Sequence, residues 1–532
     1  MIRVTGDDDR VSGAAIWLLL GVTAVACLDA INGTALAIAR ADIMGSIHTT
    51  PDEAAWLNMA YLMAKLTAFP IGAWLGLRID RGQCLVGSTV VIILSSLAGG
   101  LTTEFYQLVI WRALQGVSGA VLLVVGQTVL FEFLPRGRQP LVQAAFALAV
   151  VAMPTAIAPA AQGWLTETLS WSWIFLLNLP GGLIGLAMIL AGLGAIPVVQ
   201  RATIRLDWVG LMLFAVAMVC LVYVLQQGNR WNWFAESRIV NLSIVGMIAV
   251  LAFAAWEIRS QGRDPLIDLA TFHDPNFAFG FIVSFVAGCA LFGSAFLIPL
   301  FALSVLGFSE TYAGLLLLPS GALTGLGLFA AAALIQVRRL SPIKLVPVGI
   351  VLFMSAMWLL SGSTSESGIP DMTTALLLRG FGLGPLFVAL TLITFLGLGG
   401  PRLAHGVALF NFGRQFGGLI GVAFLQTYLA HQAALNRSVL ATHFTPGSPA
   451  LEARQNAITD LLATQGYSSE MAAAVTAMIQ RSLQTQIMTL SFNEGFLVLA
   501  LLFVSAAPML IAVKIILAMT AGRKAVDERA TE

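Results

Sequence analysis

The chain has 532 residues, of which 58% are hydrophobic and only 10% are charged, and its formal net charge is +1. An ordinary soluble domain carries roughly 25% charged residues, so this composition excludes that class and predicts a polytopic membrane protein embedded in the lipid bilayer. Apolar runs of about 20 residues recur without the alternating pattern of a barrel, which predicts helical spans. The near-neutral charge gives no reason to expect nucleic acid as a partner.

Runs of about 18 or more apolar residues, broken by polar residues, Gly or Pro, predict fourteen transmembrane helices. Lys and Arg gather in the loops on the N-terminal side, whereas the opposite short loops hold only Arg40, Arg230 and Arg238. By the positive-inside rule both termini are expected in the cytoplasm. The expected spans are 13–39, 53–75, 84–102, 106–133, 139–163, 172–196, 206–226, 238–258, 276–300, 309–336, 342–361, 371–398, 403–430 and 488–518.

The first span carries a carboxylate, Asp29, and an amide, Asn32. An isolated charge at bilayer depth costs roughly 2.5 to 3.5 kcal/mol on insertion scales, so an acid here needs a reason. Counted from the outer end of its span, Asp29 is expected ~15 Å deep. We interpret Asp29 as a residue that handles a proton.

The second span carries a base, Lys65, which is expected ~18 Å from its outer end and therefore at a similar depth to Asp29. If the two residues face one another, they form a buried pair in which the acid stays ionised until the lysine is displaced. The alternative is a permanent ion pair that fixes helix packing and has no role in transport.

The fourth span carries Arg112 about six residues from its outer end. Gln115 follows about one turn later and is placed to hydrogen-bond the same region. Arg112 is expected only ~9 Å inside, so it has two possible positions. It either lies near the acid of the first span or extends to the outer interface.

The fifth span contains Pro154, Pro159 and Gly163, which interrupt its hydrogen-bond ladder. Inside a bundle such a break predicts a bend at a working interface, and a tolerated kink is the alternative.

The second half of the chain holds two intramembrane arginines, Arg379 and Arg414. We expect them to bind an anionic part of a substrate or to pair with carbonyls at helix ends. Asn411 and Gln415 flank Arg414, so this stretch is polar enough to line a cavity.

One predicted outer loop, residues 431–487, is long and polar. Long loops without a reason are uncommon, so an ordered element or a docking surface is expected, and a solvated spacer is the open alternative.

Two segments repeat each other eight helices apart, at 111–116 and 378–383, and each has an arginine followed by small residues. Two six-helix halves separated by two inserted helices give this offset, and such repeats build many transporters. The expected organisation starts with a cytoplasmic segment, 1–12, and a first bundle, 13–196. Two inserted helices, 197–275, lead to a second bundle, 276–518, which includes the loop 431–487, and a cytoplasmic tail, 519–532.

A series of motifs resembles one family over nearly the whole length. The segments that carry the resemblance are Leu28-Asp29, Trp56 to Gly72, Arg112 to Gly116, Leu134-Pro135, Pro159 to Trp164, Trp171 to Pro180, Trp256-Glu257, Pro265 to Leu269, and Arg414 to Gly421. In this order they resemble the major facilitator superfamily, and within it the fourteen-helix drug:proton antiporters of the EmrB type. Two motifs depart from the usual pattern. Leu77 stands where the family usually has an acid, and Ala158 and Gln162 stand where the fifth-helix motif usually has glycine.

The resemblance implies a major facilitator fold and proton-coupled export of hydrophobic small molecules from a bacterium through its inner membrane. It also implies a periplasmic membrane-fusion adaptor and an outer-membrane channel as partners, with residues 431–487 as the docking candidate. We assign proton coupling to Asp29, Arg112 and Lys65, and substrate contact to Asn32, Gln115, Arg379, Asn411, Arg414 and Gln415. Gly72, Asp80, Arg81, Pro154, Pro159 and Gly163 are expected in gating or structural motifs.

Other functions remain open from the sequence. The same fold suits a dedicated exporter of one endogenous anionic metabolite, lipid or siderophore, for which the two arginines of the second half argue. A non-transporting receptor has little reason to keep buried acids and bases. No nucleophile triad, phosphate-binding Gly-Lys loop or metal-ligand spacing occurs in the sequence, and its four cysteines form no disulfide pattern, so neither an enzyme nor a cofactor or metal is expected.

Overall fold

The computed structural model describes residues 12–34, 40–197, 204–259, 264–395, 397–443, 449–464 and 471–531. Throughout these ranges the regular structure is helical, and fourteen helices are long and apolar enough to cross a membrane. The all-α membrane fold with fourteen spans is therefore confirmed.

The first half contains six spans, some of them built from more than one helical segment. Its elements are α1 (Gly13–Asn32), α2 (Arg40–Ser46), α3 (Pro51–Arg78), α4 (Arg81–Leu101), α5 (Phe105–Phe133), α6 (Gln139–Ala147), the π-helix η2 (Leu148–Ile157), α7 (Ala158–Thr168), α8 (Ser172–Leu176) and α9 (Asn178–Gly192). The inserted pair is α10 (Trp208–Gln227) and α11 (Ser237–Arg259).

The second half repeats this plan and adds a long extension. Its elements are α12 (Pro275–Ser304), α13 (Glu310–Leu315), α14 (Leu318–Arg338), α15 (Leu345–Leu360), α16 (Ile369–Phe395), α17 (Pro401–His443), α18 (Pro449–Thr464) and α19 (Met471–Thr531). Short polar residues before the apolar runs set several of the helix starts. Asp80 caps α4 and Asp274 caps α12 through their side chains, while Thr50 and Glu53 form a capping box on α3.

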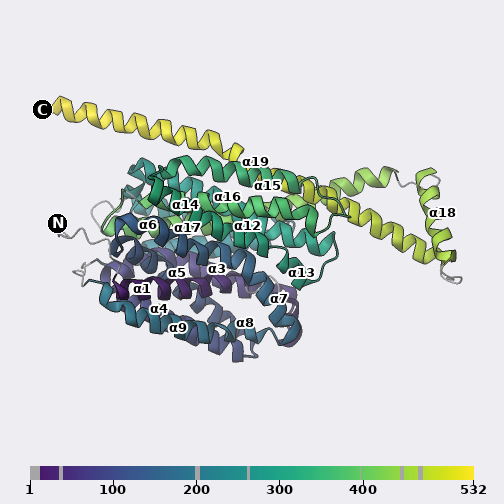
Figure 1. Ribbon diagram of the computed structural model, residues 1–532, viewed down its shortest axis with the longest axis horizontal. Coiled ribbons are helices and arrows are strands. Elements are labelled where there is room, and N and C mark those ends of the chain that lie inside the picture. Colours follow the sequence, from purple (N-terminus) through teal and green to yellow (C-terminus); the bar gives the residue numbers. More distant parts are fainter. Residues whose placement is uncertain are drawn as a thin grey trace.

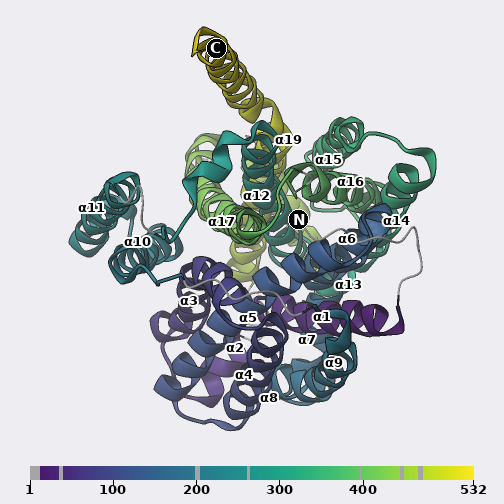
Figure 2. The same ribbon diagram turned by 90° about the vertical axis from the view of Figure 1, so that its left-hand side faces the viewer.

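The two halves lie side by side, and their helices run roughly parallel to the long axis of the molecule (Figure 1). We call the end at which α1 begins the basal end, and the opposite end, beyond which α18 lies, the hairpin end. Viewed onto the basal end, α10 and α11 lie outside the bundle beside α3 and α17 (Figure 2).

Contacts between the halves occur at both ends of the bundle. At the basal end the Phe131 ring of α5 packs edge-on against Phe395 of α16, with the centroids 5.6 Å apart. At the hairpin end α13 lies directly on α7, and a Cβ at Gly314 would be 2.9 Å from the Ala160 Cα atom. Such close approach requires small residues at the interface. The two halves are therefore in contact at both ends of the bundle.

The inserted pair bridges the seam between α3 and α17. Arg230, which follows α10, forms an ion pair with Asp52 of α3 at 2.6 Å. Trp233 donates a hydrogen bond to Thr427 of α17 at 3.1 Å, and the rings of Phe214 and Phe412 pack 5.6 Å apart. The pair therefore contacts both halves.

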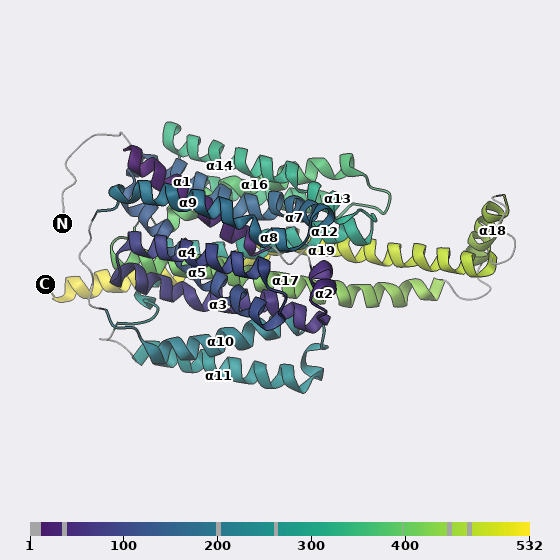
Figure 3. The same ribbon diagram turned by 90° about the horizontal axis from the view of Figure 1, so that it is seen from below.

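Predicted boundaries were wrong in three parts of the chain. The first span ends at Asn32 and not at residue 39, and residues 35–39 lie outside the described part of the chain. The predicted outer loop 431–487 is largely helical, because α17 continues to His443 and α19 begins at Met471 (Figure 3). Hydropathy detects only the apolar portion of such a helix, so its polar continuation was read as a loop. The predicted tail 519–532 likewise begins within α19.

The extension is an antiparallel pair of helices joined through α18. Asn436 of α17 donates to Ser491 of α19 at 3.1 Å, and Arg437 donates to Gln484 at 3.0 Å. We refer to residues 431–487 as the hairpin. The sequence left open whether this segment is an ordered element or a solvated spacer, and its described residues form an ordered element.

We expect Gly384→Val to destabilise the second half. A Cβ at Gly384 would run into the backbone of Gly327 and Leu328, and overpacking of this kind costs about 1–3 kcal/mol. Thermal unfolding of the purified protein in detergent should show a lower midpoint for this variant. Gly399→Val is the control, since nothing lies within 4 Å of a Cβ there, and an equal loss for both variants would contradict the packing argument.

Candidate functional site

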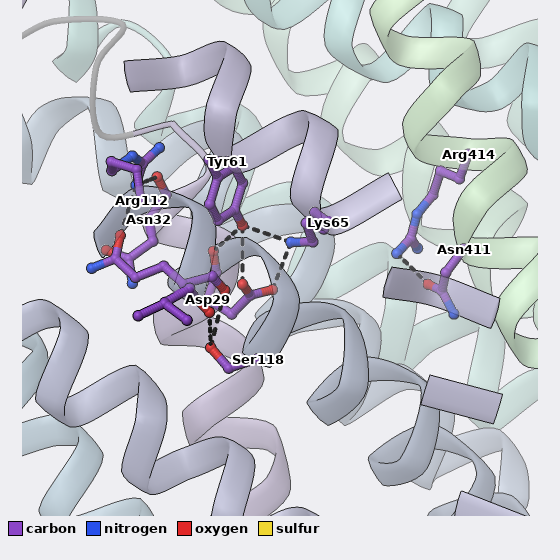
Figure 4. A network of polar contacts seen from close by, with 10 residues as sticks. Asp29, Asn32, Tyr61, Lys65, Arg112, Ser118, Asn411 and Arg414 are labelled. Carbon is purple, nitrogen blue, oxygen red and sulfur yellow. Dashed lines mark hydrogen bonds and ion pairs between the residues drawn. The ribbon is translucent and has the colours of Figure 1, made fainter. Parts of the chain in front are cut away.

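A buried ion pair joins the first two spans. The Nζ atom of Lys65 lies 2.7 Å from Oδ2 of Asp29, and the two side chains are 5% and 1% exposed. The Tyr61 hydroxyl lies 3.0 Å from Asp29 Oδ1, to which it donates, and accepts from Lys65 Nζ at 2.7 Å (Figure 4). Both carboxylate oxygens are therefore engaged by α3. The geometry brings together the acid and the base that the sequence placed at similar depth.

The pair lies near the middle of the bundle, at a place where α1 ends. Lys65 is ~21 Å along α3 from Pro51 at 1.5 Å per residue. Asp29 is in the last turn of α1, and not ten residues before its end as the predicted boundary required. Asp29 still lies at a depth similar to that of Lys65, because α1 is short and ends inside the bundle.

The end of α1 leaves backbone carbonyls that need donors, because water is scarce at this depth. The Gly33 N–H donates to the Asp29 carbonyl, and the N–H and hydroxyl of Thr34 donate to the Ile31 carbonyl. Three side chains from three helices add further bonds. Tyr61 of α3 donates to the Asp29 carbonyl at 3.0 Å, Gln162 of α7 to Ile31 at 3.1 Å, and Arg112 of α5 to Asn32 at 3.1 Å. The segment that carries the acid is thus fixed from several sides.

Arg112 is fully buried, at 0% exposure, so the alternative that it extends to the interface is wrong. Its guanidinium also donates to the Leu57 carbonyl and to Gln115 Oε1, at 3.3 and 3.0 Å. The guanidinium carbon lies 4.5 Å from the centroid of the Tyr61 ring, a cation–π distance. Tyr61 therefore contacts Asp29, Lys65 and Arg112 at once.

The two amides expected near the substrate are held by protein groups. Asn178 donates to Asn32 Oδ1 at 2.7 Å, and Gln115 donates to Ser96 at 3.1 Å. Both are 1% exposed. In this conformation they fasten the end of α1 to its neighbours, and a substrate role for Asn32 or Gln115 stays a prediction.

Gly119 of α5 makes room for the acid. A Cβ at this position would run into the Asp29 carboxylate. The carboxylate therefore packs against backbone, where a larger residue would displace it from Lys65.

Arg379 occupies the matching position of the second half. It donates to Ser294 of α12 at 2.9 Å and to Ser320 of α14 at 2.8 Å, and it is 1% exposed. In the repeat, α12 and α14 correspond to α1 and α3, which hold Arg112. Among the described residues, no carboxylate contacts Arg379 and its Nη2 atom has no partner.

Arg414 begins a chain of hydrogen bonds between the halves. It donates to Asn411 at 2.8 Å, and Asn411 donates to Gln127 of α5 at 2.8 Å. Gln127 continues to Gln143 of α6 at 3.4 Å. Gln415 is half-buried beside Arg414 in the sequence. Opening the basal end must break the bond between Asn411 and Gln127.

The expected motif residues lie at helix ends and interfaces. Arg81 pairs with Glu132 of α5 at 2.5 Å, Asp80 caps α4, and a Cβ at Gly72 would lie 3.2 Å from the Val121 Cα atom of α5. Pro154 lies inside η2. Pro159 and Gly163 lie on α7, which packs against α13.

Three contributors were missed from the sequence: Tyr61, Gln162 and Gln127. Tyr61 precedes Lys65 by four residues and so shares its helix face, a signal that was available. The sequence marks Gln162 only as a departure from the fifth-helix motif. Nothing in the spacing of Gln127 indicated a contact with the other half.

Comparison with known proteins supports the architecture. The sequence profile of the Major Facilitator Superfamily matches residues 22–422. The chain belongs to this superfamily. Its members are transporters and not enzymes.

Several superfamily members are similar to the chain over most of their length. Multidrug export protein EmrB of Haemophilus influenzae is 27% identical over 446 residues, which cover 82% of this chain and 85% of that protein. Multidrug export protein EmrB of Escherichia coli K12 is 26% identical, covering 88% and 89%, and Fatty acid resistance protein FarB of Neisseria gonorrhoeae is 26% identical, covering 94% and 97%. The EmrB-type resemblance is confirmed.

A solved superfamily structure shows the same fold. The inward-facing, unoccupied crystal structure of a bacterial homolog of the human lysosomal transporter Spinster aligns with a TM-score of 0.53 at 14% identity, covering 95% of this chain and 98% of that one.

We expect Lys65→Met to destabilise the protein by about 3–5 kcal/mol, because it leaves the Asp29 carboxylate buried without its cation. Combining it with Asp29→Asn should recover most of that loss, since no unpaired charge remains. Thermal unfolding of the single and double variants in detergent measures both effects. Additive losses in the double variant would contradict a direct pair.

Proposed function

We propose that this protein is a proton-coupled exporter of hydrophobic small molecules, and that Asp29 carries the proton. The buried Asp29–Lys65 pair at the end of α1 is the observation that carries the proposal. A charge pair at mid-depth is costly, and in transporters such residues mark proton relays. The printed names of the relatives, multidrug export and resistance proteins, support this choice of substrate class.

The coupling step is an exchange of partners at Asp29. A proton that reaches Oδ2 neutralises the carboxylate, and Lys65 then loses the partner that holds it at 2.7 Å. Tyr61 keeps contact with both side chains during the exchange, since its hydroxyl bonds each of them. The neutralised carboxylate leaves the positive charge of Lys65 without a partner, and this change in charge biases the rocking of the two halves. Proton entry supplies ~2.3 kcal/mol per charge for each 100 mV of membrane potential.

The orientation that suits this direction places the basal end in the cytoplasm. The excess of Lys and Arg in the loops at that end supports this arrangement, with both termini inside. The membrane is then the inner membrane of a bacterium, and protons enter from the hairpin end. The names and organisms of the relatives support the same location.

The hairpin is proposed as the docking element for a periplasmic membrane-fusion adaptor, which would connect the exporter to an outer-membrane channel. It extends beyond all the transmembrane helices at one end (Figure 3). It is formed by two helices that are continuous with spans of the bundle: α17 leaves the bundle and α19 enters it, so movements of the spans reach the hairpin directly.

A second candidate is an exporter of one anionic compound. Lys65, Arg112, Arg379 and Arg414 are buried within their spans, and among them Lys65 is the cation that pairs with Asp29. Arg379 has a free N–H group and no counter-charge among the described residues. A carboxylate on the cargo would accept from this N–H group and would supply the counter-charge. Arg379 therefore favours an amphiphilic acid over a cation as cargo.

We expect wild-type protein in proteoliposomes to export a probe when a pH gradient is imposed, and Asp29→Asn to lose at least about 90% of this gradient-driven rate, as for loss of a proton site. Ethidium and a pyrene-labelled fatty acid serve as probes, and preference for the fatty acid favours the second candidate. Glu366→Gln is the matched comparison, because it makes the same acid-to-amide change at an exposed position between α15 and α16. Undiminished transport by Asp29→Asn, or transport of neither probe by wild type, would contradict the proposal.

We expect the hairpin to be required for the adaptor and dispensable for transport. Arg437 and Gln484 lie in contact, so a short Gly/Ser turn can replace residues 439–482 without separating the helices. The shortened protein should lose co-purification of the adaptor while it keeps gradient-driven export in proteoliposomes. Unchanged co-purification would count against docking at the hairpin.

A further inference from the structure

The fifth span differs from the family pattern at Gln162, and the structure gives this residue a specific contact. Gln162 lies on α7 and is 2% exposed. Its Nε2 atom donates to the Ile31 carbonyl of α1 at 3.1 Å. Ile31 is two residues from Asp29, so Gln162 holds the same helix turn that carries the acid. A glycine, which the family usually has here, makes no such contact.

The helix that carries Gln162 also contacts the opposite half. A Cβ at Gly163, the next residue, would lie 3.4 Å from Thr311 of α13. Gly314 of α13 packs more closely still, since a Cβ there would lie 2.9 Å from the Ala160 Cα atom. Separation of the halves at the hairpin end must therefore release α7 from α13.

A stretch of π-helix connects α7 to the rest of its span. The element η2 has ten residues and contains Pro154, which has no N–H group to donate. Such stretches frequently mark functional sites and places where a helix bends. Because η2 precedes α7, a change in its hydrogen bonds lets α7 shift while α6 stays in place.

The amide of Gln162 is held on one side only. Its Oε1 atom is buried and has no partner among the described residues. The bond to the Ile31 carbonyl is therefore the contact that keeps the Gln162 side chain against α1. When α7 moves, this bond is lost, or it pulls the last turn of α1 along.

We propose that Gln162 is a positioning residue that connects the contact between α7 and α13 with the proton site on α1. Closure at the hairpin end places Gln162 against Ile31 and keeps Asp29 beside Lys65 and Tyr61. Opening removes the donor of α7 and leaves the Ile31 carbonyl to the N–H and hydroxyl of Thr34. The end of α1 then loses its link to α7, and the way Asp29 is held changes. This inference rests on the proposed function, because it assumes that Asp29 carries the proton.

The test compares cargo binding with proton release in the purified full-length protein. The probe is ethidium or the pyrene-labelled fatty acid, whichever wild type transports, and its binding is followed by fluorescence. Protons released on probe binding are measured in weakly buffered solution. Gln162→Met keeps the length of the side chain and removes the donor. Thr166→Ala is the matched control, because the Thr166 hydroxyl bonds only carbonyls of its own helix, those of Gln162 and Gly163.

We expect Gln162→Met to bind the probe within about twofold of wild type while the protons released per bound probe fall about threefold or more, the scale of one lost hydrogen bond. Thr166→Ala should match wild type in both measurements. A parallel loss of binding and proton release would assign Gln162 a structural role, and unchanged release would also overturn the inference. Asp29→Asn separates the two proposals. If it keeps full proton release, the proposed function fails, whereas loss in Asp29→Asn with a normal Gln162→Met removes only the role of Gln162.

Discussion

A helix that ends inside a membrane must find donors for its last carbonyls, and this constraint organises the first half of the protein. The end of α1 receives hydrogen bonds from Tyr61, Gln162 and Arg112, each on a different helix. The same turn carries Asp29, whose charge is balanced by Lys65 at 2.7 Å. Backbone satisfaction and charge pairing are thus met by one set of side chains. A proton that arrives at Asp29 disturbs a junction of several helices, which is why a local change can move a whole half.

The two halves use the same frame for different purposes. Arg112 is held by the helix pair α1 and α3, and Arg379 by the corresponding pair α12 and α14. The first site contains an acid and a second base, whereas serine hydroxyls stand around Arg379. Under the proposed function this asymmetry assigns proton handling to one half. In the other half, no carboxylate among the described residues pairs with Arg379. Between them, the bond from Asn411 to Gln127 joins the halves directly.

Much of the fold followed from hydropathy, because a span needs about 20 apolar residues and its loops carry the charge. The similar depth of Asp29 and Lys65 on consecutive helices left their pairing open, because depth alone does not say whether the two helix faces meet. Hydropathy gave no warning that α1 ends at Asn32, since apolar residues continue beyond it, or that polar residues after 430 extend α17 as a helix. Contacts such as Gln127 with Asn411 depend on which helix faces meet, and one sequence does not specify that. Arg112 shows the same limit, because its depth suited both the interface and the buried position that it occupies.

The central claim is that Asp29 gains and loses a proton as cargo binds. Infrared difference spectroscopy of the purified protein in lipid tests it directly, because a protonated carboxyl group has a C=O stretching band that a carboxylate lacks. The account predicts a band that appears on acidification, decreases when cargo is added, and is missing from Asp29→Asn. A band unchanged by Asp29→Asn, or the same spectrum with and without cargo, would contradict it.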